Sequence, residues 1–125
     1  GAYQDSIDAA EARTRSIDYT ERAMADDVVS RVLEAQSTFE DAARRVATYR
    51  DALVPRSEGA YRSVLGAYTV GRGNLAQMLL AQRDLLNFKV EYEEAKADLE
   101  IARVGIEELT VLSLASLEEG GVRDE

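Results

Sequence analysis

Apolar residues recur along the first half of the chain at alternating steps of four and three residues. This spacing places them along one face of an α-helix, as in the seam of a coiled coil. A second apolar series lies about one residue further along, so the predicted helix has two neighbouring apolar faces. The first series consists of Val28, Val32, Ala35, Phe39, Ala42, Val46, Tyr49 and Leu53, and the second of Val29, Leu33, Ala43, Ala47, Val54, Tyr61, Leu65 and Tyr68.

The second half of the chain has the same arrangement. A helix that packs against one neighbour needs one apolar face, so two faces on each helix predict neighbours on both sides. Exposed apolar faces of this extent are typical of an interface, and we therefore expect the chain to associate with copies of itself. Here the first series is Met78, Ala81, Leu85, Phe88, Tyr92, Ala95, Leu99, Ala102, Ile106 and Leu109, and the second is Leu79, Leu86, Val90, Ala97, Ile101 and Val104.

Gly71, Gly73 and Asn74 interrupt the apolar pattern between the two halves. Glycine permits a positive φ angle and asparagine can cap a helix, so these residues predict a tight turn. The expected fold is all-α, a long antiparallel helical hairpin of the coiled-coil type. Its first helix is the longer one, which leaves roughly the first 20 residues without a partner in the chain. The helices are expected over residues 6–68 and 75–115, and the turn over residues 69–74.

Pro55 lies inside the first predicted helix. Proline removes one backbone hydrogen bond and its ring clashes with the preceding turn, so we expect a kink, or less favourably a break, over residues 51–54. A break leaves open a second fold for the isolated chain, in which three shorter helices fold back on one another.

The two ends of the hairpin also carry signals. Asp5 or Ser6 can cap the start of the first helix, because short side-chain oxygens accept hydrogen bonds from free backbone N–H groups. Gly120 and Gly121 lie in a mainly polar stretch, so residues 118–125 are predicted to form a disordered tail. The helical hairpin domain is thus expected to span residues 1–117.

The chain contains 24 acidic and 15 basic residues, for a net charge of −9, and it has neither cysteine nor histidine. These absences exclude disulfides, thiol catalysis, Cys/His zinc sites and histidine general bases. The negative charge disfavours binding to nucleic acid and to anionic membranes. Carboxylate pairs such as Asp26-Asp27 and Glu93-Glu94 point about 100° apart on a helix, which is typical of a solvated face. We expect no enzymatic activity, no metal and no cofactor.

Several groups of residues keep a distinctive order across the turn. They are Leu53-Val54-Pro55; Tyr68-x-x-Gly71 followed by Leu79-x-Ala81-Gln82-Arg83-x-Leu85-Leu86; and Tyr92-x-x-Ala95-x-x-Asp98-Leu99 followed by Ala102 and Leu109-Thr110. In order and spacing, over about residues 5–111, they resemble the periplasmic helical hairpin in the second repeat of the TolC-like outer-membrane efflux channels. Val111 stands where that family usually has glycine.

The resemblance implies a function in transport. Channels of this family are trimers, and each protomer has two repeats of barrel strands and a helical hairpin that builds a periplasmic tunnel. This chain matches only one hairpin, which implies a piece of the tunnel wall in a multidrug efflux, metal efflux or type I secretion system. The implied partners are a periplasmic adaptor protein and an inner-membrane pump. The implied location is the periplasmic part of an outer-membrane channel in a Gram-negative bacterium, with the hairpin itself soluble and free of membrane contact.

Position in the hairpin assigns roles to residues near the turn. Family members meet the adaptor at the tip, although from composition alone the glycines need serve only as a turn. Tyr68 falls where the family has a tyrosine that holds the entrance closed, although the residue also lies in an apolar series and can simply pack. Some members place aspartates of the tunnel entrance at the positions of Gln77 and Leu80, and this sequence has neither aspartate. The implied adaptor contacts are Val70, Gly71, Arg72 and Gly73, and the implied entrance residues are Tyr68, Gln77 and Leu80.

A second function class also fits the apolar pattern. A soluble coiled-coil scaffold, or an adaptor hairpin with no pore, needs the same two helices and the same turn. The flanking gene sequence separates the two readings. An upstream copy of the hairpin with alternating-pattern strands supports the channel, whereas a neighbouring soluble or lipoyl-like domain supports the scaffold.

Overall fold

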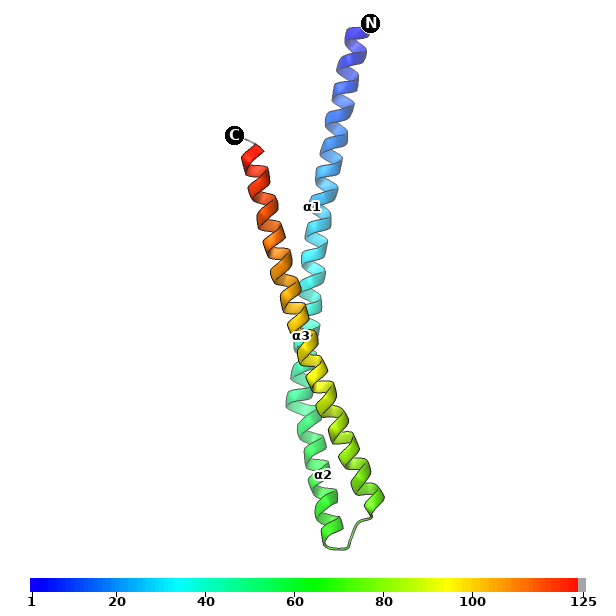
Figure 1. Ribbon diagram of the computed structural model, residues 1–125. Coiled ribbons are helices and arrows are strands. Elements are labelled where there is room, and N and C mark those ends of the chain that lie inside the picture. The colour runs from blue at the N-terminus through cyan, green and yellow to red at the C-terminus, as the bar shows by residue number, and fades with distance from the viewer. Residues whose placement is uncertain (124–125) are drawn as a thin grey trace.

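In a computed structural model, the protein forms two long helical rods joined by a short turn (Figure 1). The structure describes the backbone of residues 1–123 and the side chains of residues 1–121. The first rod is continuous, and the second returns antiparallel to it, which confirms the predicted all-α hairpin. In chain order the elements are α1 (Ala2–Thr48), a π-helical turn η1 (Tyr49–Leu53), α2 (Val54–Thr69) and α3 (Leu75–Arg123).

The two rods pack along one apolar face of each. Val46, Leu85 and Ala95 are the buried residues among those described, so the core is thin and lies between α3 and the first rod. All ten residues of the first apolar series on α3 are buried or half-buried, as the spacing predicts. On α1 and η1 the same holds for the first series from Val32 to Leu53. The heptad spacing therefore identifies the packed faces correctly.

Beyond the crossing, the N-terminal part of α1 and the C-terminal part of α3 diverge (Figure 1). Every residue from 8 to 31 is exposed, which is a longer unpartnered stretch than the sequence predicts. The apolar series weakens there, because Thr14 and Glu21 interrupt it. Helices stay side by side only while an unbroken seam holds them together. Ile17 and Met24, which continue the spacing, consequently project into solvent.

The irregularity predicted at Pro55 is present as a widened turn and not as a break. The backbone N–H of Val54 donates to the carbonyl oxygen of Tyr49, five residues earlier, and the residues on both sides keep helical φ and ψ angles. In a regular α-helix the ring of Pro55 would clash with the carbonyl of Asp51. The π-helical turn relieves this clash and keeps the rod continuous. The alternative fold with three shorter helices is therefore wrong.

The π-helical turn also changes which residues face α3. It inserts one residue into the repeat, so the packed face beyond it lies one position later in the sequence. Arg56, Ala60 and Ser63 continue the heptad spacing of α1, yet they are exposed. The half-buried residues of α2 instead include Val54, Tyr61 and Leu65 of the second apolar series, together with residues such as Ser57 and Val64 that belong to neither series.

The second series of the first rod is thus not one continuous open face, as the sequence predicts. Val29 and Leu33 are exposed and Ala43 and Ala47 are half-buried. Beyond the π-helical turn, Val54, Tyr61 and Leu65 are half-buried and Tyr68 is exposed. The spacing of apolar residues alone does not show this change in the packed face, because the two series are offset by one residue and the π-helical turn also inserts one residue.

Both predicted helix ends need correction. Helix α1 begins at Ala2, so neither Asp5 nor Ser6 caps it, and Ser6 donates its hydroxyl hydrogen to the carbonyl oxygen of Ala2 at 3.0 Å. Helix α3 continues to Arg123, so the predicted disordered tail is wrong for residues 118–123, while residues 124–125 lie outside the described residues. Glycine costs only about 1 kcal/mol in a helix, and the preceding leucine, alanine and glutamate residues favour the helix.

Candidate functional site

The turn at the tip ends α2 with a specific hydrogen-bonded cap. The N–H of Gly71 donates to the carbonyl oxygen of Tyr68 at 3.0 Å, and the N–H of Arg72 donates to that of Ala67 at 2.8 Å. Gly71 has a φ angle of 76°, which is the left-handed region that favours glycine. This pair of bonds with a left-handed glycine is the Schellman motif. The prediction that a glycine of the turn needs positive φ is confirmed at Gly71.

Gly73 and Asn74 close the turn from the other side. A Cβ atom on Gly73 would lie 3.3 Å from the backbone nitrogen of Tyr68, so glycine permits a close approach of the turn to the end of α2. Asn74 Oδ1 accepts a hydrogen bond from the N–H of Gln77 at 2.7 Å, which confirms the predicted cap of α3. The tip is consequently a compact turn between two capped helix ends.

The four predicted adaptor contacts lie together at this end of the hairpin (Figure 1). Val70 and Arg72 are exposed, Val70 at 67%. A Cβ atom on Gly71 would meet no atom within 4 Å, so the backbone is uncovered there. The tip therefore offers open backbone, one apolar side chain and one cation to an approaching molecule.

The three predicted entrance residues flank the tip on both helices. Tyr68 lies in the last turn of α2 and is exposed at 39%, so it is not tightly packed in the hairpin. Gln77 and Leu80 lie in the first turns of α3 and are exposed. A tunnel constriction is built by several copies, so the entrance roles of these residues stay predictions.

Polar contacts between the helices surround the thin core. The ring of Tyr49 lies 6.4 Å from that of Phe88 between centroids, and its hydroxyl donates to Glu91 Oε2 at 3.0 Å. Arg45 pairs with Asp98 across the helices at 3.2 Å. Exposed pairs of this kind contribute roughly 0–1 kcal/mol, so they help to fix the register more than the stability. The tyrosine hydroxyl at the rim of the seam agrees with its predicted seam position.

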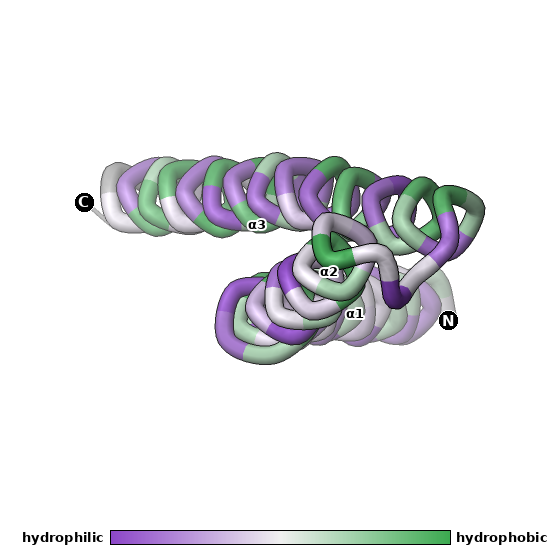
Figure 2. Tube along the Cα trace, turned by 90° about the horizontal axis from the view of Figure 1, so that it is seen from below, coloured by the Kyte–Doolittle hydropathy of each residue, from purple (hydrophilic) through white to green (hydrophobic). Residues whose placement is uncertain are grey.

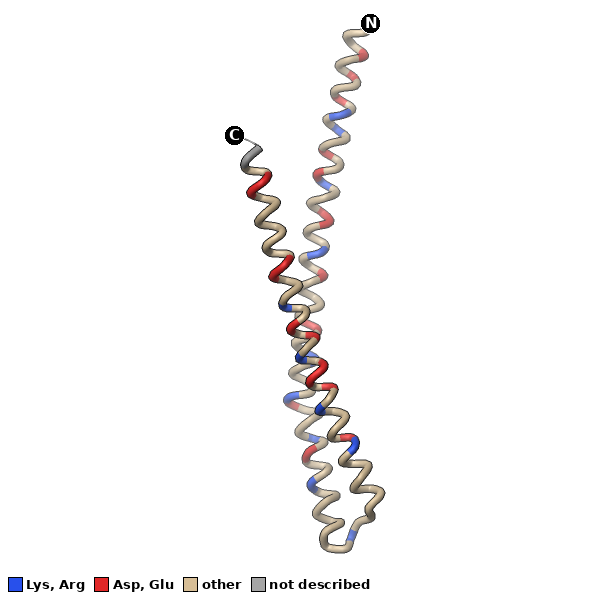
Figure 3. The backbone as a smooth tube through the Cα atoms, in the orientation of Figure 1, with Lys and Arg blue, Asp and Glu red and all other residues tan. Residues whose placement is uncertain are grey.

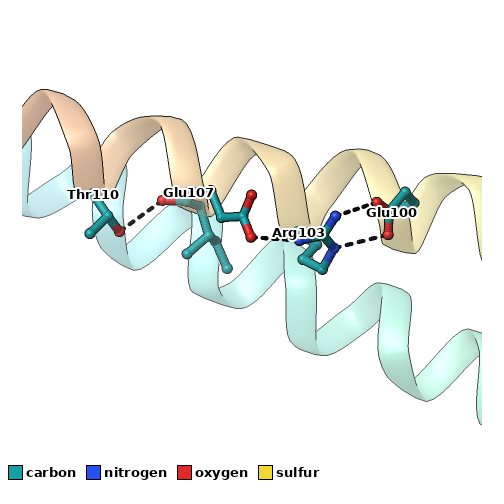
Figure 4. A network of polar contacts seen from close by, with 5 residues as sticks. Glu100, Arg103, Glu107 and Thr110 are labelled. Atoms are coloured by element: carbon teal, nitrogen blue, oxygen red, sulfur yellow. Dashed lines mark hydrogen bonds and ion pairs between the residues drawn. The ribbon is translucent and has the colours of Figure 1, made fainter.

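Charged residues of α3 also pair along their own helix (Figure 4). Arg103 donates to the carboxylates of Glu100 and Glu107, and Thr110 donates its hydroxyl hydrogen to the carbonyl oxygen of Ile106 at 2.9 Å. The hydrogen bond from Arg103 lowers the pKa of the Glu100 carboxyl. Both partners are exposed, so this network is part of a solvated face of α3.

The second apolar series of α3 is not covered by the hairpin. Hydrophobic and hydrophilic residues alternate along the whole of α3, whereas α1 is more hydrophilic (Figure 2). Leu85 is exposed at only 8%, but its neighbour Leu86 is exposed at 54%. We call the six residues of this series the lateral face, and all of them are exposed. They are Leu79, Leu86, Val90, Ala97, Ile101 and Val104.

Charge is segregated along the rods, a feature that the apolar pattern and the net charge do not predict (Figure 3). Residues 54–89 contain five basic and two acidic residues, whereas the rest of the chain contains ten basic and 22 acidic residues. The net charge of the whole chain averages over this difference. The contrast is visible only when charged residues are counted separately in the segment between Pro55 and the position opposite it on α3, and in the rest of the chain.

Two general site classes receive no support from the described part of the chain. Among the side chains of residues 1–121, no three His, Cys, Asp or Glu residues gather in a way that could hold a metal ion. None of the described helices has a stretch that is long and apolar enough to cross a membrane. A comparison of the chain with protein-family models, curated proteins and solved structures found no match.

Proposed function

We propose that this chain is the periplasmic hairpin of the second repeat of an outer-membrane efflux channel. In this proposal α1, α2 and α3 form part of the tunnel wall of a trimer, and the tip docks a periplasmic adaptor that links the channel to an inner-membrane pump. The observation that carries the proposal is the position of the tip signature. Tyr68 and Gly71 fall at the Schellman cap, and the Leu79–Leu86 segment lies near the start of α3, which begins at Leu75. This arrangement supports the resemblance.

The lateral face supports the same function. A tunnel wall made of hairpins needs each returning helix to pack against its own rod on one side and against a neighbouring hairpin on the other. Helix α3 has one apolar series packed and one exposed, so a neighbouring copy would cover apolar area that otherwise contacts water. Conduction through such a tunnel is passive, and the pump supplies the energy.

A substitution at the tip of the full-length channel tests the docking role. Replacing Gly71 with leucine in the parent protein is expected to lower resistance to exported drugs several-fold. Leucine covers the open backbone and is strained at a φ angle of 76°. Resistance is measured as the minimum inhibitory concentration in a strain that has no other outer-membrane efflux channel, with channel abundance checked by immunoblot.

Two further variants separate docking from folding. Gly71→Asn tolerates the left-handed conformation and adds a polar side chain, so it should assemble normally and still impair efflux. Gly120→Leu adds the same bulk as Gly71→Leu at the opposite end, where a Cβ atom meets nothing within 4 Å, and should retain resistance. Full resistance in both Gly71 variants would contradict the docking role of the tip, whereas a parent protein that confers no resistance at all would favour the coiled-coil scaffold.

A further inference from the structure

The basic end of the hairpin differs from the rest of the molecule in how its cations are paired. Arg56, Arg62, Arg72 and Arg83 are exposed, and none has a carboxylate within ion-pair distance among the described residues. Lys89 pairs with Glu58 at 3.8 Å. Elsewhere most described cations have partners on their own helix or across the seam. These pairs are Arg31 with Asp27, Arg44 with Asp41, Arg45 with Asp98, Arg50 with Asp51, Lys96 with Glu93, and Arg103 with Glu100 and Glu107.

The unpaired arginines extend well back from the tip. Arg56 lies 14 residues before Val70, which is about 20 Å along the helix at 1.5 Å per residue. Arg62 and Arg83 lie between this position and the tip, on the two opposite helices. The positive charge is therefore spread along the distal end of the hairpin and not concentrated at the turn. We call Arg56, Arg62, Arg72 and Arg83 the basic collar.

This shape favours an elongated protein partner over a membrane. A flat anionic surface that touches the tip would lie close to Arg72. Arg56 would lie more than two Debye lengths from that surface, since the Debye length is about 8 Å, and would be screened from it. A protein partner that extends from the tip along the sides of the hairpin can contact all four arginines.

We infer that the distal end, residues 54–89, docks a protein partner whose contacting surface is acidic. The inference rests on the proposed function, which makes this end the docking end. Parallel copies in a trimer would bring three such collars together, and the repulsion between them would be relieved by an anionic partner. Complementary charge of this kind raises the association rate and selects the correct partner.

A titration of the isolated chain with short poly-L-glutamate tests the inference. The backbone amide signals of the isotope-labelled protein are followed by nuclear magnetic resonance. Signals from residues 54–89 should shift, those from residues 8–31 should not, and high salt should abolish the effect. Equal shifts along both rods, or no shift, would overturn the inference.

Charge-reversed variants supply the matched comparison. Arg62→Glu with Arg83→Glu should weaken binding of poly-L-glutamate at least roughly tenfold. Arg13→Glu with Arg22→Glu reverses two arginines that are also exposed and unpaired but lie in the acidic shaft, and should leave binding unchanged. Both double variants change residues at exposed helix positions. Circular dichroism is used to check that each variant still forms the helical hairpin.

A second binding experiment replaces poly-L-glutamate with vesicles of phosphatidylglycerol and phosphatidylcholine. Tighter binding to them than to poly-L-glutamate would assign the collar to lipid and overturn the inference. This outcome is separable from the proposed function, because the Gly71 variants test adaptor docking in the full-length channel without reference to charge.

Discussion

Replacing Leu85 with alanine is expected to lower the free energy of unfolding by about 2–3 kcal/mol. Leu85 is one of three buried residues in the described chain, and it packs where α3 meets the first rod. Its truncation leaves a cavity in a core that has little other material to fill it. The neighbouring substitution Leu86→Ala removes the same atoms from a side chain exposed at 54% and should cost less than about 0.5 kcal/mol.

The comparison is made by urea denaturation followed by circular dichroism, at a protein concentration low enough to limit association. The two leucines are adjacent in sequence, so differences in helix propensity cancel between the variants. Similar losses of stability at both positions would mean that α3 does not distinguish a packed face from an open one, and the assignment of the lateral face would be wrong.

The second large effect concerns the register of the first rod. Deleting Ala52 together with the substitution Pro55→Ala removes the extra residue and the reason for the π-helical turn. A regular α-helix then presents the same residues to α3, and the melting temperature should stay within a few degrees of the original. Deleting Ala60 instead leaves the π-helical turn in place and rotates the rest of α2, which brings Arg62 towards α3. This variant should melt at least about 10 °C lower.

Thermal unfolding followed by circular dichroism measures both deletions. Each variant loses one alanine from a helical segment, and the single substitution Pro55→Ala is the reference for the Ala52 deletion. The difference that remains reports the register and not the loss of a residue. A deletion of Ala52 as damaging as that of Ala60 would show that the π-helical turn has a role other than shifting the packed face.

Much of the fold can be predicted from periodicity and turn chemistry. The steps of four and three residues give the packed faces of both helices, and Gly71 with Asn74 gives the turn and the cap. These features are local, since each depends on residues within one or two helical turns. Proline at position 55 correctly locates the irregularity for the same reason.

The remaining features depend on the partner helix and not on the local sequence. The local sequence does not show whether Pro55 causes a kink or a one-residue insertion. With the insertion, Tyr61 and Val64 are half-buried and Arg56 and Ser63 are exposed. The divergence of the two ends likewise follows from the whole seam. At the candidate site, the tip residues follow from the turn, whereas the basic collar is hidden in the net charge of −9.

Sedimentation equilibrium over a wide concentration range tests most directly the central claim, that each returning helix packs on its own rod with one face and on a neighbouring copy with the other. The weight-average mass should rise above 13.8 kDa as the concentration increases. A variant with Leu86→Ser and Val90→Ser on the lateral face should stay folded and remain at the monomer mass. A value of 13.8 kDa for the unaltered chain at every concentration would contradict the claim.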